Sequence, residues 1–136
     1  MRVMLDTNIL ISMILFPGKK FEVILEHITK HHKLLLSSFV VDELFAVADR
    51  KFPAKKSVID SFLTDLSYEL VYTPRNMKGN LFEIRDMKDY PVLYSAIIEN
   101  ADVLITGDKD ILEVKVELPD IVTPMEYIEK YVCSGN

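Results

Sequence analysis

The sequence predicts an α/β fold in which helices cover both faces of a parallel β-sheet. The first observation is a set of short, continuous apolar runs, such as "RVML" near the start and "DVLI" near residue 105, which are typical of strands buried on both faces. The second is that these runs alternate along the chain with segments of helical periodicity, as in successive β-α-β units. The third is size, because 136 residues, 49% of them apolar, suit one domain with a substantial core.

The elements expected in the first half of the chain are a strand at 2–6, a helix at 7–16, a helix at 21–31, a strand at 33–37 and a helix from 38 to about 50. The segment "PGKK" (17–20) separates the first two helices, because proline and glycine both disfavour helix interiors. Phe21, Ile24 and Ile28 recur at steps of three and four, which is the spacing of an amphipathic helix. Ser37 or Ser38 can cap the last helix.

The elements expected in the second half are a helix at 57–66, a strand at 68–73, a helix at 92–100, strands at 102–106 and 120–124, and a helix at 125–131. The segment "PRNMKGN" (74–80) has the composition of a loop. Pro91 is expected to precede a helix directly, since proline is well tolerated at a helix start. We expect residues 1–132 to form a single domain and "CSGN" (133–136) to be a flexible tail.

The composition excludes several classes of protein. With four glycines, the chain has neither a dinucleotide fingerprint nor a P-loop, and its single cysteine, Cys133, allows neither an internal disulfide nor a cysteine-based zinc site. No apolar run approaches the roughly 20 residues of a membrane span. No signal peptide is recognisable, so a cytoplasmic location without membrane attachment is expected. The net charge of −5 comes entirely from residues 101–136, which argues against a general nucleic-acid binder.

Acidic residues follow two of the expected strands. Asp6 ends the first strand, and Asp108 and Asp110 come directly after the strand at 102–106. The carboxyl ends of parallel strands meet at one edge of the sheet, where ligands of open α/β sheets bind. Each acid also has a plain structural role open to it, because Asp6 suits a turn and Asp108 suits the N-cap of the short turn "KDILE".

Two further acids can reach the same edge from helices. In the helix from 38 to about 50, Glu43 has apolar neighbours one turn away, so it lies on or beside the buried face. An unpaired carboxylate there is costly, which favours either a metal or an ion pair with Lys or Arg. Asp89 lies two residues before Pro91, a position that suits an N-cap as well as a metal ligand.

Asp6, Glu43, Asp89 and Asp108 together predict a metal centre. Four carboxylates at one edge would repel one another and raise their pKa values unless a cation neutralised them. Ligation by oxygen alone suits Mg²⁺ or Mn²⁺ rather than zinc. A divalent cation held by acids can activate water and stabilise a leaving oxygen, which is the chemistry of phosphodiester hydrolysis.

Three motifs, "MLDTNILIS" (4–12), "LLSSFVVDELFAV" (35–47) and "RDMKDYPVLYSAIIENADVLITGDKDIL" (85–112), resemble in order and spacing those of the PIN-domain family. That family includes the ribonucleases of VapC-type toxin–antitoxin systems, and "FPGKKFEVI" and "RKF" resemble a subgroup of PIN-family toxin components. The resemblance spans nearly the whole chain. It implies a three-layer α/β/α sandwich with a central parallel sheet of four or five strands. It also implies a single-strand-selective endoribonuclease that uses Mg²⁺ or Mn²⁺ and leaves a 5′-phosphate and a 3′-hydroxyl.

The resemblance implies roles for individual residues. The catalytic and metal-binding acids would be Asp6, Glu43, Asp89 and Asp108. Residues that would support these acids are Asn8, Asp86, Thr106 and Asp110. Asp86 stays an alternative to Asp89 as the third ligand, and Asp110 likewise stays an alternative to Asp108. The implied partners are an RNA substrate and an antitoxin protein that blocks the site, while the apolar helices allow a homodimer.

The same residues give less support to other functions. An aspartyl nucleophile of the haloacid dehalogenase type needs a second Asp two residues after the first, where this chain has Asn8. A receiver-like phosphoacceptor needs paired acids on the first strand, and Asp6 has no acidic neighbour. A non-catalytic module that uses the fold to bind nucleic acid or protein stays open. The three histidines, His27, His31 and His32, are expected at the surface and away from the acids.

Overall fold

The computed structural model describes residues 1–134, and its centre is a five-stranded sheet in which all neighbouring strands run parallel. The strands are β1 (Arg2–Leu5), β2 (Lys33–Ser37), β3 (Glu69–Val71), β4 (Val103–Ile105) and β5 (Asp120–Val122). Their order across the sheet is β3-β2-β1-β4-β5. The prediction of a parallel sheet of four or five strands is therefore confirmed.

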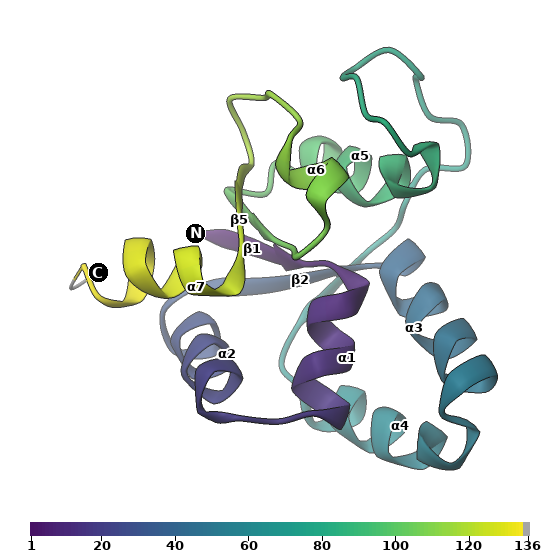
Figure 1. Ribbon diagram of the computed structural model, residues 1–136, viewed down its shortest axis with the longest axis vertical. Helices are drawn as coiled ribbons and strands as arrows, with labels where there is room; N and C mark the ends of the chain where they lie inside the picture. The colour runs from purple at the N-terminus through teal and green to yellow at the C-terminus, as the bar shows by residue number, and fades with distance from the viewer. Residues whose placement is uncertain (135–136) are drawn as a thin grey trace.

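Helices cover both faces of this sheet (Figure 1). The helices on one face are α1 (Thr7–Leu15), α2 (Lys19–His31), α3 (Ser38–Lys51) and α4 (Lys56–Asp65). The helices on the other face are α5 (Tyr90–Ile98) and α6 (Lys109–Leu112). The predicted three-layer α/β/α sandwich is confirmed. Among residues 1–134, no helix combines the length and the apolar character needed to cross a membrane.

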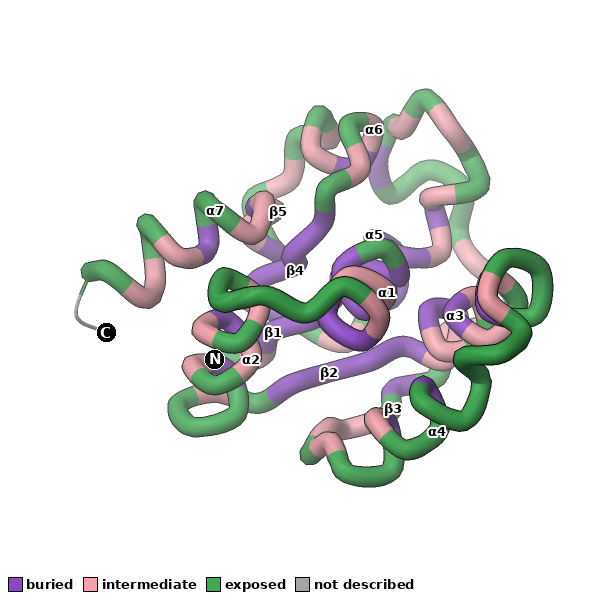
Figure 2. Tube along the Cα trace, turned by 60° about the horizontal axis from the view of Figure 1, so that its bottom comes forward, coloured by how far each residue is buried: buried purple, intermediate pink, exposed green. Residues whose placement is uncertain are grey.

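The three central strands carry the core of the protein. Val3, Leu35 and Leu104, one from each of β1, β2 and β4, have no exposed surface, and all three strands are coloured as buried in Figure 2. Strands of this kind read as continuous apolar runs because helices exclude water from both of their faces. Burying one such side chain contributes about 2 kcal/mol to stability. The residues that follow these strands are consequently held on a rigid support.

Several element boundaries differ from the expected ones for local reasons. α5 begins at Tyr90, earlier than expected, because Pro91 fits inside the first helical turn, and the 3₁₀ turn η2 (Met87–Asp89) leads into it. A second 3₁₀ turn, η1 (Pro53–Lys55), links α3 to α4 in the interval between the two helices expected at 38 to about 50 and at 57–66. The C-terminal helix is also divided, because α7 (Pro124–Tyr127) continues as the π-helical turn η3 (Ile128–Val132). Of the expected tail, residues 133–134 are exposed and residues 135–136 lie outside the described chain.

The expectation that all three histidines lie at the surface is wrong for two of them. His27 and His32 are half-buried at the end of α2, and Nδ1 of His27 lies 2.8 Å from the hydroxyl of Tyr127. The cause is that α7 packs against α2 and covers this end of the helix, a long-range contact that the periodicity of α2 does not reveal. His32 directly precedes β2, so His27 and His32 lie at the amino edge of the sheet, away from Asp6 and Asp108 at its carboxyl edge.

The strand order creates a crevice between β1 and β4. The chain passes from β1 through β2 to β3 in one direction, and then crosses back to β4 and β5 on the other side of β1. In doubly wound sheets, ligands bind outside the carboxyl ends of the strands at such a reversal. Asp6 follows β1 and Thr106 follows β4, so both residues lie at this switch point.

Candidate metal centre at the carboxyl edge of the sheet

Asp6 is a buried acid that both begins a helix and faces the crevice. It is the N-cap of α1, and its Oδ1 accepts a hydrogen bond of 2.7 Å from the backbone N–H of Thr7. Its Oδ2 accepts a second bond of 2.7 Å from the hydroxyl of Thr106. Burial raises the pKa of Asp6, and the carboxylates of Glu43 and Asp108 act in the same direction, against the two hydrogen bonds. Asp6 is therefore a fixed carboxylate in a setting of crowded negative charge.

Asp108 combines the capping role with an oxygen that stays available. Its Oδ1 accepts from the backbone N–H groups of Asp110 at 2.8 Å and Ile111 at 3.2 Å, which caps α6. Its own N–H donates to the hydroxyl oxygen of Thr106 at 3.0 Å. Within residues 1–134, Oδ2 of Asp108 has no hydrogen-bond partner. Capping and metal binding are thus compatible in one carboxylate.

Glu43 reaches the crevice from the middle of α3. It is half-buried, and its immediate neighbour Leu44 is fully buried, so it lies beside the apolar face as the helical pattern predicts. Its Oε1 accepts a hydrogen bond from the hydroxyl of Thr7, the residue after Asp6. The alternative that Glu43 is a rim acid paired with Lys or Arg is not what the described residues show, since no ion pair to it is present among them.

Asp89 enters the site from the turn before α5. The prediction left open whether it caps that helix, and the structure shows no capping hydrogen bond from its side chain. Asp86 caps the preceding turn η2, because its Oδ1 accepts from the N–H of Lys88 at 3.0 Å. Burial and the nearby carboxylates, that of Asp108 first, raise the pKa of Asp89 to about 6. Because its side chain has no hydrogen-bond or ion-pair partner among residues 1–134, the carboxylate of Asp89 is available to a ligand.

One pocket of about 350 Å³ brings these side chains together. Its acidic lining consists of Asp6, Glu43, Asp89 and Asp108, and Asn8 lines it as well. Three further polar lining residues were not predicted from the sequence, namely Thr7, Arg50 and Lys51. A signal for Arg50 was present, because it follows Glu43 by seven residues and so lies two turns along the same face of α3.

A second group of acids shares Asp89 with this pocket. Carboxylate oxygens of Asp86, Asp89 and Asp110 lie within 4.8 Å of one another, and among residues 1–134 they are the trio of potential metal ligands that approaches so closely. The guanidinium of Arg85 donates to both carboxylate oxygens of Asp110, at 2.7 and 2.8 Å, and lowers its pKa. Asp110 is therefore already neutralised by a cation, which favours Asp108 over it as a ligand.

The four acids of the pocket are spread more widely than that trio, and their chemistry still fits a hard cation. All donors are carboxylate oxygens, the ligands that Mg²⁺ and Mn²⁺ prefer. Mg²⁺ loses its water reluctantly and is commonly held by one or two carboxylates directly, with waters bridging to the others. An open cluster of carboxylates around this pocket suits that mode of binding.

The chain combines a doubly wound α/β fold with an acidic crevice at its switch point. The family model for the PIN domain matches residues 2–110, which is most of the chain, and the protein belongs to the PIN-domain family. The recognition of this family from the sequence motifs is thereby confirmed.

The fold also has a counterpart among solved structures. A chain in the crystal structure of VapBC2 from Rickettsia felis bound to a DNA fragment from their promoter is similar to this one, with a TM-score of 0.65 and 24% sequence identity. The alignment covers 90% of this chain and 97% of that chain, so the shared fold extends over nearly the whole molecule. No curated protein matches the sequence.

Proposed function

We propose that this protein is a Mg²⁺- or Mn²⁺-dependent endoribonuclease that hydrolyses RNA phosphodiester bonds and acts as the toxin of a toxin–antitoxin pair. The observation that carries the proposal is the convergence of Asp6, Glu43, Asp89 and Asp108 on one pocket at the sheet's switch point. These four acids come from four separate segments of the chain, so their meeting is a property of the fold and not of any single motif. Membership of the PIN-domain family supports the same chemistry.

The residues of the acidic pocket have different roles in the proposed hydrolysis. When bound, the cation supplies an activated water and neutralises charge on the phosphate. Asp6 is oriented by Thr7 and Thr106, which fix both of its oxygens. Arg50 and Lys51 line the pocket and attract the phosphate of an RNA strand toward an otherwise acidic crevice. The products would be a 5′-phosphate and a 3′-hydroxyl.

The proposal extends to partners. The similar Rickettsia felis chain belongs to a VapBC2 complex, and by analogy this protein would bind an antitoxin that covers the acids. Formation of a homodimer and a cytoplasmic location belong to the same proposal. The alternative function is a non-catalytic PIN-fold module that binds nucleic acid or protein without hydrolysing it.

Cleavage of single-stranded RNA by the purified protein tests the proposal. We expect cleavage with Mn²⁺ or Mg²⁺, none with a chelator, and a loss of more than about a hundredfold in Asp6→Asn, because that change removes a charged ligand while preserving shape. Asp60→Asn is the matched control, since Asp60 is exposed on α4 and does not line the acidic pocket. Wild-type rates in Asp6→Asn would contradict the assignment. RNA binding without cleavage by the wild-type protein would favour the non-catalytic module.

A further inference from the structure

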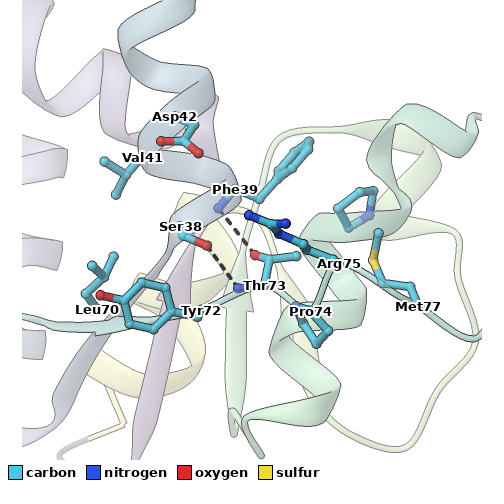
Figure 3. Close-up of a pocket in the computed structure, with 11 residues that line it drawn as sticks. Ser38, Phe39, Val41, Asp42, Leu70, Tyr72, Thr73, Pro74, Arg75 and Met77 are labelled. Atoms are coloured by element: carbon cyan, nitrogen blue, oxygen red, sulfur yellow. Dashed lines mark hydrogen bonds between the residues drawn. The ribbon is translucent and has the colours of Figure 1, made fainter.

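A second pocket lies beside the first turn of α3, next to the end of β3. It has a volume of about 630 Å³ and is lined largely by apolar groups, including Phe39, Leu70, Pro74 and Met77. Its polar lining includes Tyr72, Arg75 and Asp42, and Figure 3 shows these side chains arranged around Thr73. We refer to it as the α3–β3 pocket. None of the four acids of the candidate metal centre lines it.

Tyr72 and Arg75 of the α3–β3 pocket have polar groups that are available to a ligand. Tyr72 is 74% exposed, although its ring could bury a large apolar area. Neither the hydroxyl of Tyr72 nor the guanidinium of Arg75 has a hydrogen-bond or ion-pair partner within the described chain, whereas Arg85 is fully paired with Asp110. An exposed aromatic ring and an unpaired guanidinium that line one pocket are groups that can stack on nucleobases.

The floor of the pocket is built from fixed groups. The hydroxyl oxygen of Thr73 accepts from the N–H of Phe39 at 3.2 Å, and its N–H donates to the hydroxyl of Ser38 at 2.9 Å, as the dashed lines in Figure 3 show. The Thr73 hydroxyl also bonds to the buried Ser95 of α5 at 2.8 Å. These bonds join β3's end to α3 and α5, so the pocket exists before a ligand arrives and binding costs little ordering.

The α3–β3 pocket and the candidate metal centre are lined by neighbouring residues of the same two elements. On α3, Phe39 lines one pocket and Glu43 lines the other, one turn or roughly 6 Å along the helix. At the start of α5, Pro91 lines one pocket and Asp89 lines the other. A ligand that occupies both pockets would therefore place an apolar group close to the acids.

We propose that the α3–β3 pocket binds an unpaired base of the single-stranded RNA whose phosphodiester enters the acidic pocket. The inference rests on the proposed nuclease function and adds the place where a base is held. The base stacks on Tyr72, and Arg75 lies within reach of the adjoining phosphate or the base plane. Asp42 on the wall accepts hydrogen bonds from base N–H groups and repels phosphate, which favours a base over the backbone in this pocket. A duplex, whose bases are stacked on one another, cannot supply this group.

Binding of a fluorescent single-stranded RNA oligonucleotide of mixed sequence, measured by anisotropy in EDTA so that no metal-dependent cleavage occurs, tests the inference. We expect Tyr72→Ala to weaken binding roughly five- to a hundredfold, the range found for loss of one stacking partner. Tyr72→Phe, which keeps the ring, should bind as the wild type does. Arg75→Gln should also weaken binding, whereas the control Lys30→Gln, at an exposed position near the end of α2, should not.

An oligonucleotide with abasic positions separates stacking from contacts with the backbone. Tyr72→Ala should lose affinity for the ordinary strand and none for the abasic strand or for a duplex of the same sequence. With 4-thiouridine in the strand, ultraviolet cross-linking should attach the RNA to the segment that contains Tyr72 in the wild-type protein. Circular dichroism of each variant verifies that the fold is intact.

Three outcomes would overturn the inference. The first is equal RNA affinity of Tyr72→Ala and the wild type, and the second is an equal loss of affinity for the ordinary and the abasic strand. The third is cross-linking confined to other segments of the protein. Any of these results would indicate that the pocket serves a protein partner and not a base. Cleavage assays with Mn²⁺ on the same preparations keep the two proposals apart. Base-dependent binding through Tyr72 without any cleavage would contradict the nuclease and support the base pocket. RNA cleavage that proceeds at the same rate in Tyr72→Ala and the wild type would support the nuclease and contradict the base pocket.

Discussion

Thr106 is the residue that connects the two strand-end acids. It has no exposed surface, and its single hydroxyl donates to Asp6 and accepts from the N–H of Asp108. One side chain therefore sets the distance between an acid that follows β1 and an acid that follows β4. A positioning role of this kind depends on the hydroxyl, not on the size of the side chain.

Replacing Thr106 tests that role. We expect Thr106→Val, which keeps the shape and removes the hydroxyl, to lower the rate of RNA cleavage by roughly ten- to a hundredfold and to weaken Mn²⁺ binding, as is typical when a group that orients a metal ligand is lost. Thr106→Ser should restore most of both. Cleavage rates and calorimetric Mn²⁺ titrations measure the two effects. Equal behaviour of the Val and Ser variants would show that the hydroxyl does not position the acids.

At the residue scale, the sequence identified acids but could not decide between neighbours. Asp86 and Asp89 are the same type of residue and lie five and two residues before Pro91, and only the three-dimensional turn shows that the carboxylate of Asp86 caps η2. In the same way, the pairing of Asp110 with Arg85 joins residues 25 positions apart, which no local pattern contains. Glu43 was the easier case, because its place beside the apolar face follows from helical periodicity alone.

Among the elements, the connection from β3 to α5 is the one on which both proposed pockets depend. It carries Tyr72 and Arg75 at one end and Asp89 at the other, and Thr73 anchors its start to α3 and α5. The sequence pattern predicted the strand and the loop-like stretch after it. It did not predict the anchor, because a threonine at a strand end has many possible partners.

Removing the Thr73 hydroxyl should loosen this connection. Ser95 donates its proton to the carbonyl of Pro91, so Thr73→Val leaves the N–H of Phe39 without its acceptor and Ser95 without a donor. We expect a loss of about 1–3 kcal/mol in the free energy of unfolding, measured with urea. Thr64→Val is the matched control, because the exposed Thr64 bonds only within α4 and should change stability by less than about 0.5 kcal/mol. A control loss as large as that of Thr73→Val would refute the anchor.

At the scale of the whole molecule, the C-terminal turn closes the fold against the edge strand. Asp120 of β5 accepts hydrogen bonds from Lys130 at 2.6 Å and from the hydroxyl of Tyr131 at 2.5 Å. Burial opposes ionisation of Asp120, but these two partners outweigh it and hold its pKa below the usual 3.8. The stabilisation is therefore fully present above pH 3.8 and is lost as the pH falls through the lowered pKa.

Acid unfolding of Asp120→Asn tests this contact. We expect the variant to be less stable than the wild type near neutral pH, and the difference to shrink as the pH falls below 3.8, because the wild-type carboxylate then gains a proton. Thermal unfolding of both proteins between pH 7 and the acid range measures it. A stability difference that stays constant through the acid range would show that ionisation of Asp120 does not contribute.

The overall fold was largely predictable, and the reason is physical. Strands that helices cover on both faces must be apolar throughout, so β1, β2 and β4 are recognisable in the sequence as continuous apolar runs. The alternation of strands and helices then permits few parallel arrangements. Features created by packing between distant segments, such as the burial of His27 beneath α7 and the π-helical end of the chain, leave no periodic signal.

The location of a bound Mn²⁺ ion tests the central claim most directly. Crystals soaked in Mn²⁺ should show an anomalous scattering peak in the pocket lined by Asp6, Glu43, Asp89 and Asp108, and crystals of Asp6→Asn should show that peak strongly reduced. A peak held instead by Asp86, Asp89 and Asp110, or no peak at saturating Mn²⁺, would contradict the claim that the four acids form the metal centre.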